Sequence, residues 1–386
     1  MDNTVKHIPI SYKQNSGVEK YLTLLKLTMV ITISIIFAIG LVMIFNTTSA
    51  EVLDHSLDKS TRGALARQIA YAGAGIGLIA CIRRAGYEQF LNISYYLLLI
   101  SIALLLLCLM PGIGRAVNGS KRWIQLFGFS FQPSEFAKYI IAGYVIQHYL
   151  CSLKGNWTFQ KFIRMLGVVA IPMFLTLIEP NNGTVGVMGL LLLVLFILGE
   201  IPAKYWAIPL VVMCVIVAVS AYHLPYVRGR VQVYLHPELD LKGKGHQPYQ
   251  AKIAAGSGKL WGKGPGNSLQ KLSYLPEAQN DYIAAIYAEE FGFTGICFLI
   301  ALYLILASCG FGIALHAETE AAYYMAASAA FLISFQAFMN LGVVSGLLPS
   351  TGLNLPFFSQ GGTSLMANLM GVGLLLDIAS RQRDNK

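Results

Sequence analysis

Residues Leu27–Phe45 read LTMVITISIIFAIGLVMIF, nineteen residues without a charged side chain. A helix needs roughly 20 apolar residues to cross the ~30 Å hydrocarbon core of a bilayer, so this stretch predicts a membrane span. The composition of the whole chain agrees, because 55% of its 386 residues are hydrophobic and only 12% are charged. No short apolar core with a small-residue cleavage site precedes Leu27, so we interpret the stretch as a retained signal anchor.

Nine further apolar segments follow, which predicts an all-α polytopic membrane protein with about ten transmembrane helices. The expected spans are approximately 24–45, 68–82, 91–109, 135–152, 162–178, 184–199, 206–224, 282–313, 321–344 and 364–379. They form one transmembrane domain, 24–380, between an N-terminal tail, 1–23, and a C-terminal tail, 381–386.

The distribution of basic residues predicts the orientation of these spans. With the N-terminus inside, the cytoplasmic segments hold thirteen Lys and Arg, whereas the short outward loops hold six. This asymmetry favours both termini in the cytoplasm of a cell whose inner membrane holds the protein. The formal net charge of +9 is then explained by this bias and by phospholipid headgroups, without nucleic acid as a partner.

One large extracytoplasmic loop, residues 225–281, is expected between spans seven and eight. It is rich in Lys and Arg although it faces outward, which long loops tolerate. It could be a solvated polar loop. We prefer an ordered anion-binding surface, because loops longer than about 15 residues in compact proteins are more often functional or disordered than idle.

Three carboxylates, Asp281, Glu289 and Glu290, stand at the start of the eighth expected span. Ionisable groups in or beside a span suggest a functional site. On a helix, positions 281, 285 and 289 share a face, and Glu289 would lie roughly 12 Å deeper than Asp281. We therefore expect Asp281 near the outer surface and the glutamates in the interior.

A second polar group is Gln132–Lys138, QPSEFAK, preceded by Arg122. Its Pro and Ser suit a helix start, and Glu135 and Lys138 are spaced to pair on one helix face. The residues alone are equally compatible with a functional group and with an interfacial anchor. The tight turn Glu179–Gly183 is expected to be structural.

An outward carboxylate beside a basic loop suits the transfer of a group from a membrane-anchored diphosphate to a hydroxyl acceptor. The carboxylate would accept the proton as general base, while Arg and Lys would stabilise the charge on the departing diphosphate. No metal or cofactor motif is required, although a divalent cation, Mg²⁺ or Mn²⁺, at the diphosphate is left open. A flippase or transporter would show similar groups.

Several motifs resemble those of the SEDS family (shape, elongation, division and sporulation). They are GLVM at Gly40–Met43, PGIGRAVNGSKRW at Pro111–Trp123, QPSEFAK at Gln132–Lys138, GNSLQKLSY at Gly266–Tyr274 and GLLPSTGLNLPFFSQGG at Gly346–Gly362. The chain is more similar to the division branch, typified by FtsW, than to the elongation branch, typified by RodA.

The resemblance implies a peptidoglycan glycosyltransferase that polymerises lipid II into glycan strands outside the cytoplasmic membrane and releases undecaprenyl diphosphate. It implies a class B penicillin-binding protein and other division proteins as partners, and Asp281 as the catalytic base. The substrate-binding residues that we expect are Arg122, Glu135, Lys138, Glu277, Glu289 and Glu290 by family match, and Lys263 from the loop without one. With no second carboxylate as nucleophile, a single displacement that inverts the anomeric centre is expected.

The chain departs from the family pattern near the expected base. Gln279 and Asn280 stand where the family usually has His-Thr, and Asn181 replaces an acid in the turn after the fifth span. Two alternatives to the enzyme therefore stay open: a lipid II flippase, and a scaffold of the division complex with reduced transferase activity.

Overall fold

The chain is predominantly helical, as the composition predicts. The computed structural model describes residues 16–55, 61–117, 120–126, 128–153, 156–211, 215, 233–236, 245–272, 275 and 278–381. The helices are α1 (Ser16–His55), α2 (Thr61–Ala85), α3 (Tyr87–Asn92), α4 (Ser94–Leu109), α5 (Pro133–Val145), the π-helical turn η1 (Ile146–Leu150), α6 (Cys151–Leu153), α7 (Phe159–Ile178), α8 (Asn182–Leu198), α11 (His246–Ser257), α12 (Ile283–Leu315), α13 (Glu320–Val344) and α14 (Gly362–Arg381).

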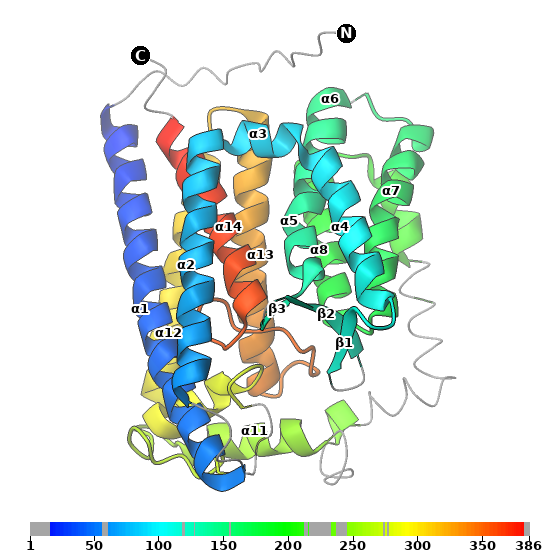
Figure 1. The fold of residues 1–386 in the computed structure, drawn as a ribbon. Helices are drawn as coiled ribbons and strands as arrows, with labels where there is room; N and C mark the ends of the chain where they lie inside the picture. Colours follow the sequence, from blue (N-terminus) through cyan, green and yellow to red (C-terminus); the bar gives the residue numbers. More distant parts are fainter. Residues whose placement is uncertain are drawn as a thin grey trace.

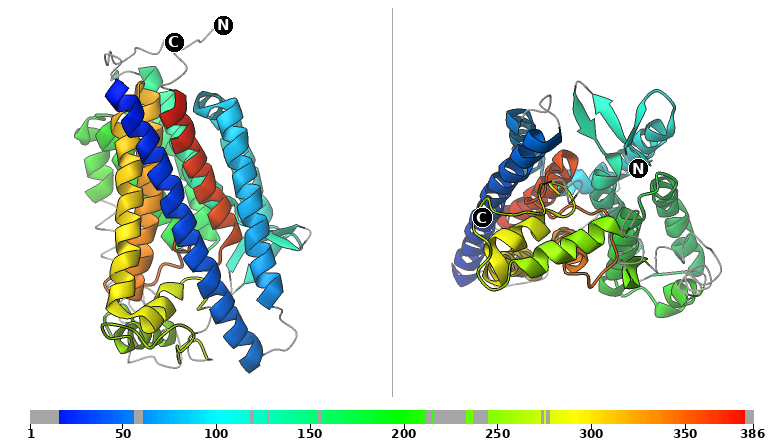
Figure 2. Two further views of the ribbon diagram at one scale, coloured as in Figure 1. Left: turned by 90° about the vertical axis from the view of Figure 1, so that its left-hand side faces the viewer. Right: turned by 90° about the horizontal axis from the view of Figure 1, so that it is seen from below.

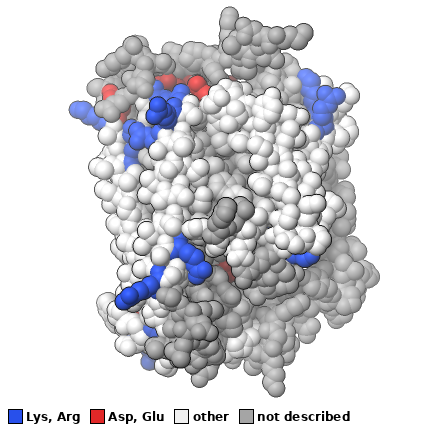
Figure 3. Space-filling model, viewed as in Figure 1, with Lys and Arg blue, Asp and Glu red and all other residues white. Residues whose placement is uncertain are grey.

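Nine of the ten expected spans correspond to helices within these residues, with α5, η1 and α6 together forming the fourth. The expected span 206–224 lies mostly outside the described residues, so the number of spans and the domain limits remain predictions. Within the described part, six helices are long and apolar enough to cross a membrane, and α4 and α8 are shorter apolar helices. Charged side chains gather toward the two ends of the molecule, with an uncharged band between them (Figure 3).

The bundle has two distinct ends (Figure 1). α1 begins and α14 ends at the upper end, which we call the terminal end. At the opposite end, the loop end, α11 lies crosswise under the long helices, and Figure 2 shows it crossing the base of the bundle. The start of α1 and the end of α14 therefore lie on the same side, as the positive-inside rule predicts for the two termini.

A small antiparallel sheet at the loop end was not predicted from the sequence. It consists of β1 (Gly114–Val117), β2 (Ser120–Leu126) and β3 (Phe129–Phe131) in the order β1-β2-β3. Ile124 of β2 is aligned with Gly114 of β1 on one side and with Phe131 of β3 on the other. Because β3 is followed directly by α5, the sheet sets where the side chains at the start of α5 lie.

Glycines allow close packing between segments that are far apart in the sequence. A Cβ at Gly40 of α1 would lie 2.6 Å from the carbonyl oxygen of Phe358, and one at Gly75 of α2 would lie 2.4 Å from Leu369 of α14. Small residues at helix interfaces let backbones approach closely in membrane proteins. The GLVM motif of the first span therefore packs against the Gly346–Gly362 motif.

The start of α12 differs from the expected arrangement. Tyr282 is the N-cap and the helix begins at Ile283, so Asp281 lies in the preceding turn and shares no helix face with Glu289. The helix is then broken at Gly292, whose φ of 68° is favoured by glycine. The expected helix face shared by Asp281 and Glu289 is therefore wrong, and the expected continuous span is interrupted three residues after Glu289.

Candidate active site

A cavity of about 1290 Å³ lies at the loop end, between the ends of the long helices, the sheet and α11. Its charged lining residues come from five parts of the chain: Arg67 of α2, Arg122 of β2, Glu135 of α5, Lys252 of α11 and Asp281. Three of the residues that we predicted from the sequence, Arg122, Glu135 and Asp281, thus share one cavity although 159 positions separate the first from the last (281 − 122).

The position of Asp281 is set through its backbone. Asn340 of α13 is 1% exposed, and its Nδ2 donates hydrogen bonds of 2.8 Å to the carbonyl oxygens of both Asp281 and Leu353. A Cβ at Gly352, whose φ is 68°, would lie 3.7 Å from the carboxylate oxygen Oδ2 of Asp281. The amide of Asn340 therefore ties the expected base to the chain segment 348–354.

The neighbours of Asp281 make two further bonds to the Gly346–Gly362 segment. Tyr282 Oη bonds Ser350 Oγ at 3.0 Å, and the backbone N–H of Gln360 donates to the carbonyl oxygen of Gln279 at 3.0 Å. The most specific sequence motif thus forms the wall that holds the expected base. The departure at Gln279 leaves this bond in place, because the backbone makes it.

Arg122 joins the sheet to the turn after α7. Its Nε donates to the carbonyl oxygen of Glu179 at 3.0 Å, and its Nη2 donates to that of Pro180. Both acceptors are backbone atoms, so the carboxylate of Glu179 is not needed for these contacts. The guanidinium group still lines the cavity, where it can bind an anion.

Glu135 and Lys138 pair as the sequence predicts. α5 has Pro133 at its start, and Lys138 Nζ lies 2.9 Å from Glu135 Oε2. Glu135 lines the cavity, whereas Lys138 is fully buried behind it. Lys138 is therefore placed to hold Glu135, and any contact of the pair with a ligand is made by Glu135.

Glu289 lies outside this cavity and binds the loop. Its side chain is 0% exposed and accepts hydrogen bonds from Lys263 Nζ, the hydroxyls of Ser257 and Ser268, and the N–H groups of Leu269 and Gln270. These five contacts occupy both carboxylate oxygens. Lys263, expected at the diphosphate, is ion-paired with Glu289.

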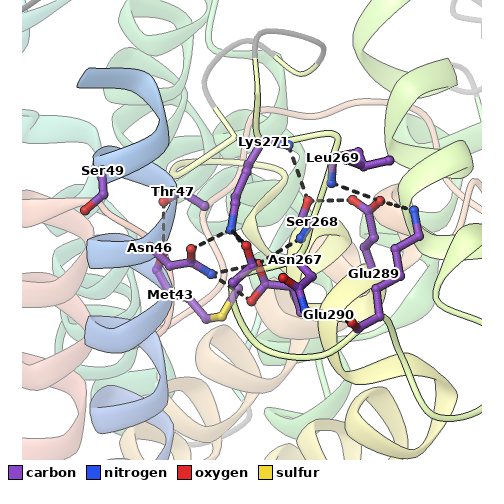
Figure 4. Close-up of polar contacts among 12 residues, drawn as sticks. Met43, Asn46, Thr47, Ser49, Asn267, Ser268, Leu269, Lys271, Glu289 and Glu290 are labelled. Carbon is purple, nitrogen blue, oxygen red and sulfur yellow. Dashed lines mark hydrogen bonds and ion pairs between the residues drawn. The ribbon is translucent and has the colours of Figure 1, made fainter. Parts of the chain in front are cut away.

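Glu290 makes a parallel set of contacts (Figure 4). It accepts hydrogen bonds of 2.7 Å from Asn46 of α1 and one of 3.0 Å from Lys271, whose Nζ also bonds Asn46. We call Asn46, Lys263, Ser268, Lys271, Glu289 and Glu290 the loop anchor. Within the described residues it joins α1, the start of α12 and residues 263–271. Glu277, the remaining predicted site residue, lies outside the described residues.

Glu179 is fully buried, and neither carboxylate oxygen has a hydrogen-bond partner among the described residues. Burial raises the pKa of Glu179 from about 4.5 to about 8, against the lowering by the nearby Cys108 thiol and the positive charge of Arg122. The folded protein therefore holds this proton more tightly than the unfolded chain.

This raised pKa predicts a pH-dependent stability. Between about pH 4.5 and pH 8 only the unfolded chain would ionise at Glu179, so the contribution of this group to stability falls as the pH rises. Glu179→Gln should therefore raise the melting temperature relative to the wild type more at pH 8 than at pH 5. Thermal unfolding in detergent at the two pH values measures this, and an equal difference at both would contradict the assignment.

Comparisons with known proteins identify the family. The model of the cell cycle protein family that groups FtsW, RodA and SpoVE matches residues 26–384. The stage V sporulation protein E of Bacillus subtilis is 36% identical over 359 residues, which cover 92% of this chain and 97% of that protein. The chain belongs to the FtsW, RodA and SpoVE family. This confirms the resemblance to SEDS proteins and the all-α polytopic membrane fold.

Other relatives carry names that state an activity. A protein of Nitrosomonas europaea named probable peptidoglycan glycosyltransferase FtsW is 35% identical over 362 residues, 92% of each chain. A chain of a solved peptidoglycan synthase complex, described as coordinating polymerization and crosslinking, superposes with a TM-score of 0.74 at 26% identity, over 93% of this chain and 98% of that one.

Sequence reasoning missed three residues of this site: Arg67 and Lys252, which line the cavity, and Asn340, which holds Asp281. Asn340 is a polar residue inside an apolar helix, a pattern that suggests a functional role in a membrane span. Lys252 is one of many basic loop residues, and nothing in the sequence distinguishes it from Lys263. Only the structure shows that Lys252 lines the cavity and Lys263 does not.

Proposed function

We propose that this protein is a peptidoglycan glycosyltransferase that polymerises lipid II on the outer face of the cytoplasmic membrane during cell division. The observation that supports this most is the single cavity that joins Asp281, Arg122 and Glu135 at the loop end. The activity named for relatives that are 34% and 35% identical over 92% of this chain supports the same reaction.

The proposed reaction is a displacement at the anomeric carbon of one lipid-linked disaccharide chain. Asp281 accepts the proton of the attacking sugar hydroxyl, the new glycosidic bond forms, and the bond to undecaprenyl diphosphate breaks. Arg122 stabilises the negative charge that develops on the departing diphosphate. Because a single displacement takes place, the anomeric centre is inverted. No step requires a resident cofactor, and adding a chelator to the assay tests for Mg²⁺ or Mn²⁺.

The extent of the cavity favours an enzyme over a flippase. A flippase needs a polar path through both leaflets, yet α14 lines the cavity only up to Ser364. The next charged residue of α14 is Asp377, which is thirteen positions after Ser364 and therefore roughly 20 Å further along the helix. Between them Asn368 is the only polar side chain, among buried residues such as Leu369, Leu374 and Leu375.

The departures from the family pattern do not remove the proposed site, which favours an enzyme over an inactive scaffold. Asn181 is buried beside the cavity wall and donates to Ser134 Oγ at 3.2 Å. Asn280 lines the cavity next to Asp281. The carboxylate and its support from Asn340 are both present.

We propose a class B penicillin-binding protein as the partner, together with other division proteins, and an inner-membrane location with both termini in the cytoplasm. The similarity to a chain of a peptidoglycan synthase complex supports a transpeptidase partner. Two observations support this orientation. The start of α1 and the end of α14 lie at the same end of the bundle, and the segments predicted on that side hold more Lys and Arg than the short loops on the other.

The decisive experiment supplies labelled lipid II to the purified protein together with its penicillin-binding partner. Glycan polymer and undecaprenyl diphosphate should appear together, and a transpeptidase-inactive partner should leave polymer formation intact. If no polymer forms but lipid II crosses the bilayer of liposomes that contain the protein, the flippase alternative replaces this proposal.

Asn340→Leu tests whether the support of Asp281 matters for the reaction. The change removes the amide donor that bonds both carbonyl groups, which should lower the free energy of unfolding by about 1–3 kcal/mol. Because small displacements of a reacting group are costly, the polymerisation rate should fall about 100-fold. Single-turnover kinetics with lipid II and thermal unfolding measure the two effects.

Ser328→Ala provides the control, since Ser328 is buried on the same helix and, among the described residues, its hydroxyl bonds only the carbonyl oxygen of Tyr324. This variant should keep the wild-type rate. If Asn340→Leu lowered stability yet also kept the wild-type rate, Asn340 would have no positioning role.

A further inference from the structure

The cavity contains a lysine whose ammonium group has no partner among the residues that the structure describes. Lys252 of α11 lines the cavity and forms no hydrogen bond or ion pair with any residue that the structure describes. The other described lysines of the large loop differ: Lys263 and Lys271 are ion-paired in the loop anchor, and Lys259 does not line the cavity. Within the described loop, Lys252 is therefore the cation available to a ligand.

The wall of the cavity is shaped around this side chain. Gly346 has a φ of 77°, and a Cβ there would lie 2.1 Å from Cε and 3.0 Å from Nζ of Lys252. Any side chain at Gly346 would displace the lysine from its path. Glycine is therefore favoured at position 346 for two reasons: it adopts the left-handed backbone conformation, and it leaves room for the side chain of Lys252 to reach the cavity.

Lys252 and Asp281 contact the same short segment. Lys252 lies against Gly346, and the Asp281 carboxylate lies against Gly352, six residues later. Even a fully extended chain of six residues spans only about 20 Å. The residues between them, Leu348 to Thr351, also line the cavity. One ligand bound along this wall can therefore contact both side chains.

An ammonium group in the same cavity as a proposed general base suits a phosphate group of the substrate. Lysine binds phosphate as a compact point charge with three donors, and charge-assisted hydrogen bonds are about twice as strong as neutral ones. Arg122 already donates through Nε and Nη2 to backbone carbonyls, so a second cation would add to the neutralisation of a diphosphate.

We propose that Lys252 binds the diphosphate of a lipid-linked sugar in this cavity, a role that rests on the proposed glycosyltransferase function. Two sources supply this chemistry, the departing diphosphate of the donor and the diphosphate that the acceptor retains. They differ kinetically. A contact with the departing group strengthens as charge develops and affects kcat, whereas a contact with the acceptor affects KM alone.

The test compares Lys252→Met with Lys252→Arg and with the control Lys259→Met, each assayed with labelled lipid II. Lys252→Met should lower kcat/KM about tenfold and weaken inhibition by undecaprenyl diphosphate by a similar factor. Lys252→Arg should keep most of the wild-type kcat/KM and most of the sensitivity to undecaprenyl diphosphate. Lys259→Met should match the wild type in both. A fall in kcat assigns the contact to the donor, and a rise in KM alone assigns it to the acceptor.

Unchanged kcat/KM and unchanged inhibition in Lys252→Met would overturn the proposal while leaving the function intact. If the wild type forms no polymer, the proposed function fails, and direct binding still tests Lys252. Quenching of tryptophan fluorescence by undecaprenyl diphosphate measures that binding, since Trp123 lines the cavity. Equal affinity of wild type and Lys252→Met in this assay would refute the role of the lysine.

Discussion

Asp281→Asn should reduce glycan polymerisation about 1000-fold, within the range of about 10² to 10⁴ that general bases contribute. The amide keeps the shape of the carboxylate but cannot accept the proton of the attacking hydroxyl. The fold should persist, because the bond from Asn340 is made to the backbone carbonyl of residue 281. The assay is polymer formation from labelled lipid II, accompanied by thermal unfolding of the same preparation.

Asp281→Glu is the informative companion to this variant, since it keeps the charge and moves the oxygens by one methylene. It should retain more activity than Asp281→Asn. Near wild-type polymer formation by Asp281→Asn, in a preparation with an unchanged melting temperature, would exclude Asp281 as the base.

Glu289→Ala should have the largest effect on stability, lowering the free energy of unfolding by about 1–3 kcal/mol, as expected when buried hydrogen-bonding groups lose their partner. Lys263, Ser268 and two backbone N–H groups would lose their acceptor. We expect residues 263–271 to detach from α12, which limited proteolysis detects, and polymerisation to fall with it. Thermal unfolding in detergent measures the loss of stability.

Glu289→Gln separates anchoring from substrate binding, the role predicted for Glu289 from the family resemblance. An anchoring residue predicts a lower melting temperature, since the charge opposite Lys263 is lost from a side chain that is 0% exposed. A substrate-binding residue predicts a higher KM with an unchanged melting temperature. Glu320→Gln at the exposed start of α13 is the matched control and should change neither.

The helices were predictable because their lengths follow from the thickness of the bilayer. The start of α5 and the pairing of Glu135 with Lys138 were also predictable, since residues three apart on a helix are neighbours whatever surrounds them. The break at Gly292 was not, because an isolated glycine is compatible with a continuous helix. The prediction of a shared helix face for Asp281 and Glu289 was wrong for a different reason, because α12 begins at Ile283, after Asp281.

For the three carboxylates near α12, the sequence predicted which residues matter but not what each one does. The sequence marked Asp281, Glu289 and Glu290 as costly groups near a membrane span, but it could not separate them by role. In the structure, Glu289 and Glu290 are occupied by the loop anchor, whereas Asp281 lines the cavity. Which carboxylate faces a ligand depends on contacts with residues 19 to 244 positions away.

Repeated membrane crossing and the family resemblance could be predicted from the amino-acid sequence, because hydrophobic length and local motifs are properties of short segments. The packing of the Gly346–Gly362 segment against Asp281, and the position of Lys252 instead of Lys263 in the cavity wall, became visible only in the folded chain. Both facts depend on where long loop segments pack, and that is decided by ion pairs and glycine contacts between distant segments, which no local pattern encodes.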